Sequence, residues 1–112
     1  MAKELVMYNR STGCPFSTIA KRVLNEQNIA YREIFIDEDI KARQQVLNWT
    51  GFLSIPTLVV AEEGEIMPYY EPAVLEKGQS PRGIDRGSMI TEAKEDELIT
   101  FLQQNGFIDS AE

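Results

Sequence analysis

The sequence predicts an α/β fold in which a small mixed sheet carries helices on both faces. Strand-like and helix-like stretches alternate along the first half of the chain, and a hairpin signal follows the third strand. A helix that joins two successive strands makes them parallel neighbours, whereas a hairpin adds an antiparallel pair. The 112 residues, of which 43% are apolar, suit one domain with a hydrophobic core.

The first three elements follow from apolar spacing and from proline. Leu5–Tyr8 is an apolar run that predicts a strand, closed by the polar stretch NRSTG. Pro15 suits the first turn of a helix that ends near Asn28. The apolar residues at helical spacing are Phe16, Ile19, Ala20, Val23 and Leu24. The alternation in AYREIFI predicts a second strand over residues 30–36.

A second helix is predicted between an aspartate cap and a glycine. Asp37 or Asp39 caps its start, and Gly51 ends it. Its buried face is expected to carry Ile40, the stem of Arg43, Val46 and Leu47.

The second half of the chain is less periodic. TLVVA predicts a third strand over 57–61, and EEGE predicts a hairpin turn into a fourth strand, IMPYY, at 66–70. Residues 71–87 show no clean period and are expected to form a long excursion, with room for a short hairpin. A closing helix that carries Leu98, Phe101 and Leu102 ends at Gly106.

Composition excludes several classes of partner. With 11 basic and 18 acidic residues, the net charge is −7, which disfavours nucleic acid and anionic membranes. The sequence shows neither a membrane-spanning apolar run nor a signal peptide, and it has no histidine for a metal site. One cysteine cannot form an internal disulfide. We therefore expect a cytoplasmic protein.

The single cysteine lies between the first predicted strand and the first predicted helix. In folds of this kind, ligands bind beyond the carboxyl ends of the parallel strands, which is where Cys14 lies. Free N–H groups and the helix dipole favour an anion there, so Cys14 is a candidate reactive thiolate. The alternative is a half-buried structural cysteine. Ser17, one helical turn away, either donates a hydrogen bond to the thiolate or bonds the backbone.

A second candidate feature is SIPT, residues 54–57, directly before the third strand. A cis peptide bond at Pro56 would leave the backbone of Ile55 free to pair with an extended peptide beside Cys14. The alternative is an ordinary trans proline at the start of a strand.

These motifs together resemble the glutaredoxin family of thioredoxin-fold proteins. Cys-Pro-aromatic follows the first strand, Ile-Pro-Thr precedes the third, and the resemblance covers roughly residues 4–67. The stretch from Tyr31 to Val60 also resembles mycoredoxins. The resemblance implies a thioredoxin-like fold within one domain, residues 1–112: a central mixed four-stranded sheet flanked by about three helices. The excursion at 71–87 would precede the last helix.

The resemblance also implies roles for individual residues. Cys14 is the nucleophile, Pro56 is a cis-proline facing it, and Ile55 offers its backbone to a thiol tripeptide such as glutathione. The loop beside the cysteine is lined by Thr12, Gly13, Pro15 and Phe16. The motif CPFS places the chain among single-cysteine, monothiol-type members.

The chain departs from the family pattern where glutathione is usually held. Ser11 stands where many members carry lysine, with Arg10 one place earlier. A Gly-Gly-x-Asp-Asp segment after the fourth strand is absent. Arg10 is therefore a candidate substrate-binding residue, and another low-molecular-weight thiol remains an alternative to glutathione.

The leading functional hypothesis is a monothiol thiol–disulfide oxidoreductase that acts in cell redox homeostasis. Its co-substrate would be glutathione or another small thiol, and its partners would be glutathionylated or disulfide-containing proteins; we expect a monomer. One alternative is an iron–sulfur carrier in which Cys14 and glutathione bridge a dimer, although Pro15 stands where cluster-carrying members have glycine. The other alternative is a non-catalytic binding module that uses the excursion.

Overall fold

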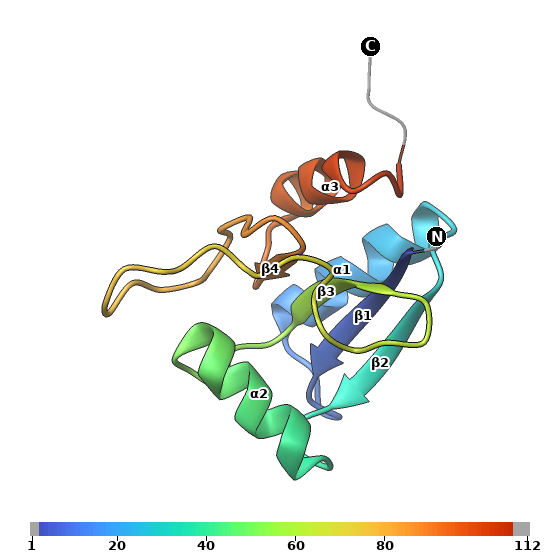
Figure 1. Ribbon diagram of the computed structural model, residues 1–112. Coiled ribbons are helices and arrows are strands. Elements are labelled where there is room, and N and C mark those ends of the chain that lie inside the picture. The colour runs from blue at the N-terminus through green and yellow to red at the C-terminus, as the bar shows by residue number, and fades with distance from the viewer. Residues whose placement is uncertain (1–2, 109–112) are drawn as a thin grey trace.

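The computed structural model describes residues 3–108, which form a mixed four-stranded sheet with helices on both faces (Figure 1). The strands are β1 (Lys3–Asn9), β2 (Tyr31–Phe35), β3 (Thr57–Glu62) and β4 (Met89–Thr91), and the helices are α1 (Pro15–Glu26), α2 (Ile40–Thr50) and α3 (Glu95–Gln104). Across the sheet the order is β2-β1-β3-β4; β1 and β2 are parallel, and the other pairs are antiparallel. This confirms the predicted α/β class and the thioredoxin-like arrangement.

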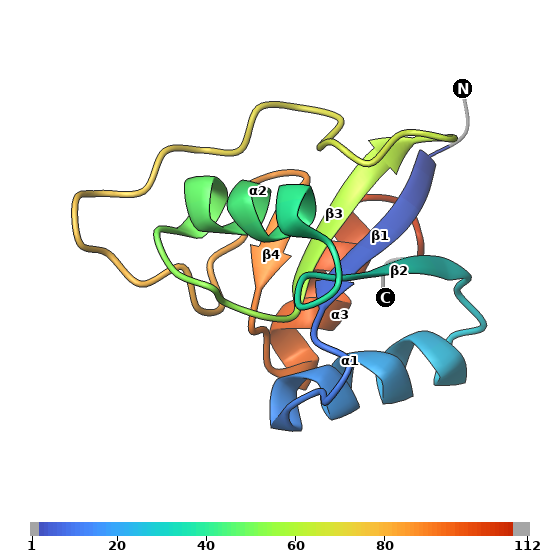
Figure 2. The ribbon, with the colours of Figure 1, turned by 90° about the horizontal axis from the view of Figure 1, so that it is seen from below.

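The central strand β1 is buried on both faces. Leu5 and Met7 point to the side that α1 and α3 cover, while Val6 and Tyr8 point to the side that α2 covers. Successive side chains of a strand face opposite sides of a sheet, so an unbroken apolar run requires cover on both. Figure 2 shows α2 on one side of the sheet and α1 and α3 on the other.

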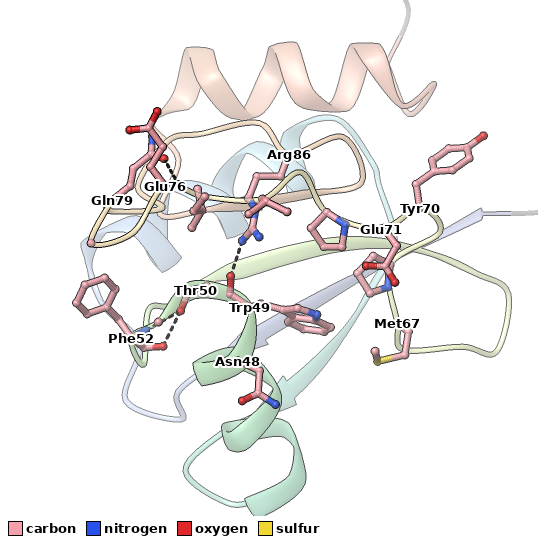
Figure 3. A pocket seen from close by; sticks show the side chains of 16 residues that line it. Asn48, Trp49, Thr50, Phe52, Met67, Tyr70, Glu71, Glu76, Gln79 and Arg86 are labelled. Atoms are coloured by element: carbon pink, nitrogen blue, oxygen red, sulfur yellow. Dashed lines mark hydrogen bonds between the residues drawn. The ribbon is translucent and has the colours of Figure 1, made fainter.

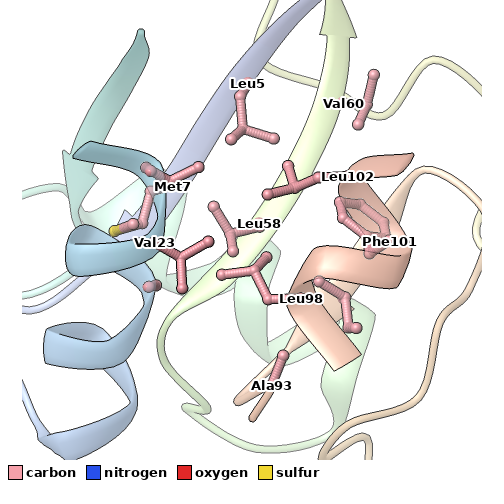
Figure 4. Close-up of a cluster of buried hydrophobic side chains, with 12 residues drawn as sticks. Leu5, Met7, Val23, Leu58, Val60, Ala93, Leu98, Phe101 and Leu102 are labelled. Carbon is pink, nitrogen blue, oxygen red and sulfur yellow. The ribbon is translucent and has the colours of Figure 1, made fainter. Parts of the chain in front are cut away.

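The larger core cluster lies between the sheet and the pair α1 and α3 (Figure 4). Its buried members are Leu5, Met7, Ala20, Val23, Leu24, Leu58, Val60, Ile90, Ala93, Leu98, Phe101 and Leu102. The predicted apolar positions of α3, Leu98, Phe101 and Leu102, are all fully buried here.

Within residues 3–108, no helix combines the length and apolarity that a membrane crossing requires.

Local signals define both ends of α2. The carboxylate of Asp39 accepts a hydrogen bond from the Ala42 N–H at 3.1 Å, so Asp39 rather than Asp37 is the cap. Gly51 ends the helix with a φ of 77°, a left-handed conformation that glycine adopts without steric cost.

The predicted buried face of α2 is partly wrong. Ile40 is 85% exposed and Leu47 is 39% exposed. The buried residues are Ala42, Val46 and Thr50. Ile40 is the first residue of the helix, directly after the cap.

The prediction of a fourth strand at residues 66–70 is also wrong. The turn at 62–65 does form, with the Glu65 N–H bonded to the Glu62 carbonyl at 2.9 Å, but no strand follows it. Pro68 interrupts this stretch because it has no N–H to donate to a ladder. Only the Tyr69 N–H reaches β3, at the Val60 carbonyl (2.7 Å). The strand that pairs with β3 on the side away from β1 is β4, beyond the excursion.

The connection between β3 and β4 is therefore a long insertion, residues 63–88, which we call the β3–β4 insertion. Its two ends are joined by Ser88, whose hydroxyl donates to the Tyr70 carbonyl at 2.9 Å. Arg86, which is 7% exposed, donates through Nε to the Ala73 carbonyl at 2.7 Å. These bonds join the two arms of the insertion to each other. The Val60 N–H, which bonds to the Ser88 carbonyl at 2.8 Å, holds the insertion against the sheet.

Tyr8 links the core to this insertion. Its hydroxyl donates to the Ile66 carbonyl at 2.6 Å, and its ring packs edge-on against Trp49, with the ring centroids 5.3 Å apart. Burial raises the pKa of the Tyr8 phenol to about 12 from its usual 10.0.

We predict that Tyr8→Phe lowers the free energy of unfolding by about 1 kcal/mol, because one partly buried hydrogen bond is lost while the Ile66 carbonyl stays hydrated. The raised pKa favours the folded state below pH 10, and this contribution disappears as the pH rises to about 12. Denaturant unfolding at neutral pH measures the first effect.

Spectrophotometric titration of the four tyrosines measures the second effect. The phenol that titrates at the highest pH in the native protein should be missing from Tyr8→Phe. Tyr70→Phe is the matched control, since Tyr70 is 62% exposed, and it should keep that phenol. Retention of the high-pH step in Tyr8→Phe would contradict the assignment.

Candidate active site

Cys14 lies between the end of β1 and the start of α1, as the sequence predicts. It is the N-cap residue of α1, with extended backbone angles (φ −166°, ψ 172°), and Pro15 begins the helix. A tight turn precedes it, in which the Gly13 N–H bonds to the Arg10 carbonyl at 3.0 Å and Gly13 adopts a φ of 70°. The thiol is half-buried, and its sulfur accepts no hydrogen bond from the N–H groups of the first helical turn.

Two oxygen atoms face the sulfur instead. Cys14 Sγ lies 3.6 Å from the Ile55 carbonyl oxygen and 3.4 Å from Ser17 Oγ. Ile55 is joined to Pro56 by a cis peptide bond. Among the hydrogen bonds of residues 3–108, none uses the Ile55 N–H, so this donor remains available beside the thiol.

The thiol opens into a cleft of about 330 Å³. The cleft is lined by Arg10, Cys14, Phe52, Leu53, Ser54, Ile55 and Glu92. Of the residues that the sequence suggests for the site, the structure thus brings Arg10, Cys14 and Ile55 together. Arg10 Nη2 donates to the Leu53 carbonyl at 3.4 Å, which holds the guanidinium over the cleft wall.

The other suggested residues surround the cleft without lining it. Thr12 is exposed on the loop, Pro15 is exposed at the start of α1, and Gly13 forms the turn. Ser17 and Pro56 are buried. The ring of Phe16 lies under the guanidinium of Arg82, 5.2 Å from the ring centroid.

The β3–β4 insertion therefore reaches the site. Its Arg82 contacts Phe16 and also pairs with Glu92 at 3.0 Å. Glu92 follows β4 directly, and its N–H bonds to the Pro56 carbonyl at 2.9 Å. Sequence analysis did not find Glu92, because the strand before it was placed elsewhere.

A partly buried network of polar side chains behind Cys14 was also not foreseen. Ser17 Oγ bonds to Asn9 Oδ1 at 2.7 Å, and Asn9 Nδ2 donates to Glu33 Oε2 at 2.8 Å. Lys21 Nζ lies 3.0 Å from the same Glu33 oxygen. The polar residue Asn9 at the end of an apolar strand is a signal in the sequence of a buried polar site, but it does not indicate the partners.

Chemistry determines the direction of these bonds. The Glu33 carboxylate only accepts, so the Asn9 amide nitrogen faces it and the amide oxygen faces Ser17. The Ser17 hydroxyl must then give its one proton to Asn9. Its oxygen, like the Ile55 carbonyl, faces the sulfur as an acceptor. The arrangement therefore suits an S–H group at Cys14, and a thiolate accepts a hydrogen bond from Ser17 only if that hydroxyl leaves Asn9.

The loop before Cys14 is anchored to the turn that follows β2. The carboxylate of Asp37 accepts hydrogen bonds from the hydroxyl and the N–H of Ser11. These bonds lower the pKa of Asp37 from its usual value, the side-chain bond most of all. Ser11 stands where many members of the family that the sequence resembles carry lysine. It fixes the loop through Asp37 and does not line the cleft.

Metal ligands do not cluster in the part of the chain that the structure describes. No group of three or more Asp, Glu, Cys or His side chains within residues 3–108 could hold a metal ion.

The fold and the site define a class: a thioredoxin-like α/β domain with one cysteine at the start of its first helix. A sequence model of the glutaredoxin family matches residues 5–65, more than half of the chain. The chain therefore belongs to the glutaredoxin family, whose members are generally thiol–disulfide oxidoreductases.

Comparison with solved structures finds a crystal structure of a glutaredoxin from Archaeoglobus fulgidus. It is 26% identical in sequence, and the match covers 61% of this chain and 77% of that chain, with a TM-score of 0.43. A search of curated proteins finds no match.

We predict that Asn9→Ala increases the rate at which iodoacetamide alkylates Cys14 at neutral pH by several-fold, because the Ser17 hydroxyl is then free to donate to the sulfur anion. The double variant Asn9→Ala, Ser17→Ala is the matched control and should lose the gain. Circular dichroism verifies that both variants fold. Equal alkylation rates in the native protein and in Asn9→Ala would contradict the assigned bond directions.

We also predict that Ser11→Ala raises the pKa of Asp37 toward that of an unperturbed aspartate without reaching it, since the hydroxyl bond, the largest cause of the lowered value, is lost while the backbone N–H at position 11 still donates. A lowered folded-state pKa adds stability above the unfolded pKa and loses it as the pH falls through the folded value. Carboxyl carbon NMR titration of Asp37 measures the change. Ser80→Ala, at an exposed serine of the insertion, should leave the titration unaltered.

Proposed function

We propose that this glutaredoxin-family chain exchanges thiols and disulfides through Cys14 alone, by a monothiol route. The observation that supports this is the position of the single cysteine, in an open cleft with its sulfur 3.6 Å from the Ile55 carbonyl. Without a second cysteine, the chain cannot resolve a mixed disulfide internally. A small external thiol has to do so.

The reaction needs two exchanges. In the first, the Cys14 thiolate attacks the small-thiol sulfur of a mixed disulfide; the new S–S bond joins Cys14 to the small thiol, and the protein thiolate leaves and takes up a proton. In the second, the thiolate of another small-thiol molecule attacks that sulfur and frees Cys14. The sum converts a protein mixed disulfide and one small thiol into a protein thiol and a small-molecule disulfide.

Three groups of the cleft suit a peptide-like thiol such as glutathione. The backbone of Ile55 can pair with an extended peptide, which aligns the substrate sulfur with Cys14. Arg10 supplies a positive charge for a carboxylate. Glu92 supplies a negative charge for an ammonium group, which would replace Arg82 as its partner. Arg10 thus takes the role of the lysine that many family members carry at the position of Ser11.

The test is turnover of a glutathionylated peptide by excess glutathione. We predict that Cys14→Ser lowers turnover to the uncatalysed background, because serine does not perform thiol exchange. Arg10→Ala should raise the KM for glutathione roughly two- to fivefold, as expected for one exposed ion pair, with little change in kcat.

Thr100→Ala, at an exposed position of α3, is the control and should match the native protein. Full activity in Cys14→Ser would refute the monothiol route. If the native protein alkylates at Cys14 but does not turn over the glutathionylated peptide, glutathione is not its co-substrate.

A further inference from the structure

A larger cavity than the Cys14 cleft lies between the end of α2 and the β3–β4 insertion (Figure 3). We call it the insertion pocket; residues 48–52 form one wall, and residues 67–79 and Arg86 form the other. Its volume is about 610 Å³, within the range of pockets that hold small organic ligands. Phe52 belongs to this pocket and also to the Cys14 cleft, so the two cavities are neighbours.

Arg86 brings a buried positive charge to this pocket. Arg86 is 7% exposed, and Nε and Nη1 donate to the carbonyls of Ala73 (2.7 Å) and Trp49 (2.6 Å). Both acceptors are neutral backbone groups, and no carboxylate within residues 3–108 pairs with this guanidinium. Nη1 also lies 3.7 Å from the neutral Met89 Sδ. Burial accordingly lowers the pKa of Arg86 from its usual value, since desolvation disfavours the charge.

One nitrogen of this guanidinium remains available. Within the described residues Nη2 has no hydrogen-bond partner, although every fully buried side-chain N or O atom there does have one. Nη2 must therefore reach open space, and Arg86 is one of the residues that line the pocket. Its two N–H groups can donate hydrogen bonds to an anion, and a planar carboxylate has the matching shape.

The other lining residues of the insertion pocket indicate what kind of ligand fits it. Its apolar lining residues are unusually exposed for their type: Phe52 is 49% exposed, Met67 47% and Val74 94%. Such surface favours an apolar body. Glu71 and Glu76 are exposed lining residues, and their charges disfavour a second negative group on the ligand.

We propose that the insertion pocket binds a small organic carboxylate with an apolar body and a single negative charge, anchored on Nη2 of Arg86. This site is separate from the thiol chemistry of Cys14 and does not depend on it. The carboxylate would neutralise a cation that the fold leaves without a counter-ion, and the apolar body would cover the exposed wall.

Trp49 makes the proposal directly measurable, because it is the only tryptophan and it lines the pocket. The full-length protein is titrated with 4-phenylbutyrate and, separately, with the neutral 4-phenylbutanamide, which has nearly the same shape. We expect a saturable change in tryptophan fluorescence with the acid. The Kd of the acid should be roughly tenfold to a hundredfold below that of the amide, as for a hydrogen bond to a charged group.

A variant tests the location without disturbing the bonds of Arg86. Val74→Asp places a negative charge on the exposed pocket wall, and it should weaken the acid several-fold while leaving the amide unchanged. Thr100→Asp, on α3, is the charge-matched control and should bind both ligands as the native protein does. Equal affinities for acid and amide, no saturable change with either, or an unaltered acid affinity in Val74→Asp would each overturn the proposal.

Discussion

The burial of β1 on both faces is the constraint on which the rest of the structure depends. Its apolar side chains pack against α1 and α3 on one side and against α2 on the other. The strand therefore lies inside the sheet, and its carboxyl end delivers Asn9 and the Cys14 loop to one edge of the core. Tyr8 extends the same constraint to the insertion, since its hydroxyl reaches Ile66. Site and insertion are thus both positioned from a single strand.

Elements with local signals could be predicted from the sequence, and elements that depend on distant pairing could not. Pro15 and Gly51 mark helix ends through their own backbone preferences, so α1 and α2 were placed almost correctly. Strand β4 has three residues, too few to show alternation, and it is stabilised by pairing with β3. The fourth strand was predicted at the apolar stretch around Pro68 instead, because composition does not reveal which segment forms the hydrogen bonds with β3.

The same division applies to the site. Cys14 and Ile55 were found because each lies in a motif directly beside a predicted strand end. The hydrogen bonds from Ser17 to Asn9 and from Asn9 to Glu33 join residues on three elements, and no spacing rule connects them. Arg86 was missed for a related reason: a charged residue among glycines suggests a solvated loop, whereas folding buries it against Trp49. Buried polar partners emerge only from tertiary structure.

The insertion also changes how the sheet meets other molecules. Gly83 donates to the Thr91 carbonyl at 2.7 Å, beside an isolated bridge from Arg82, while Tyr69 occupies the outer edge of β3 at Val60. The β4 side of the sheet is therefore already satisfied by the chain itself and offers no template for an incoming strand. Among the described strands, this leaves β2 as the side open to strand addition. Its Arg32, ion-paired with Glu4 at 3.4 Å, places a charge there that discourages self-association into fibres.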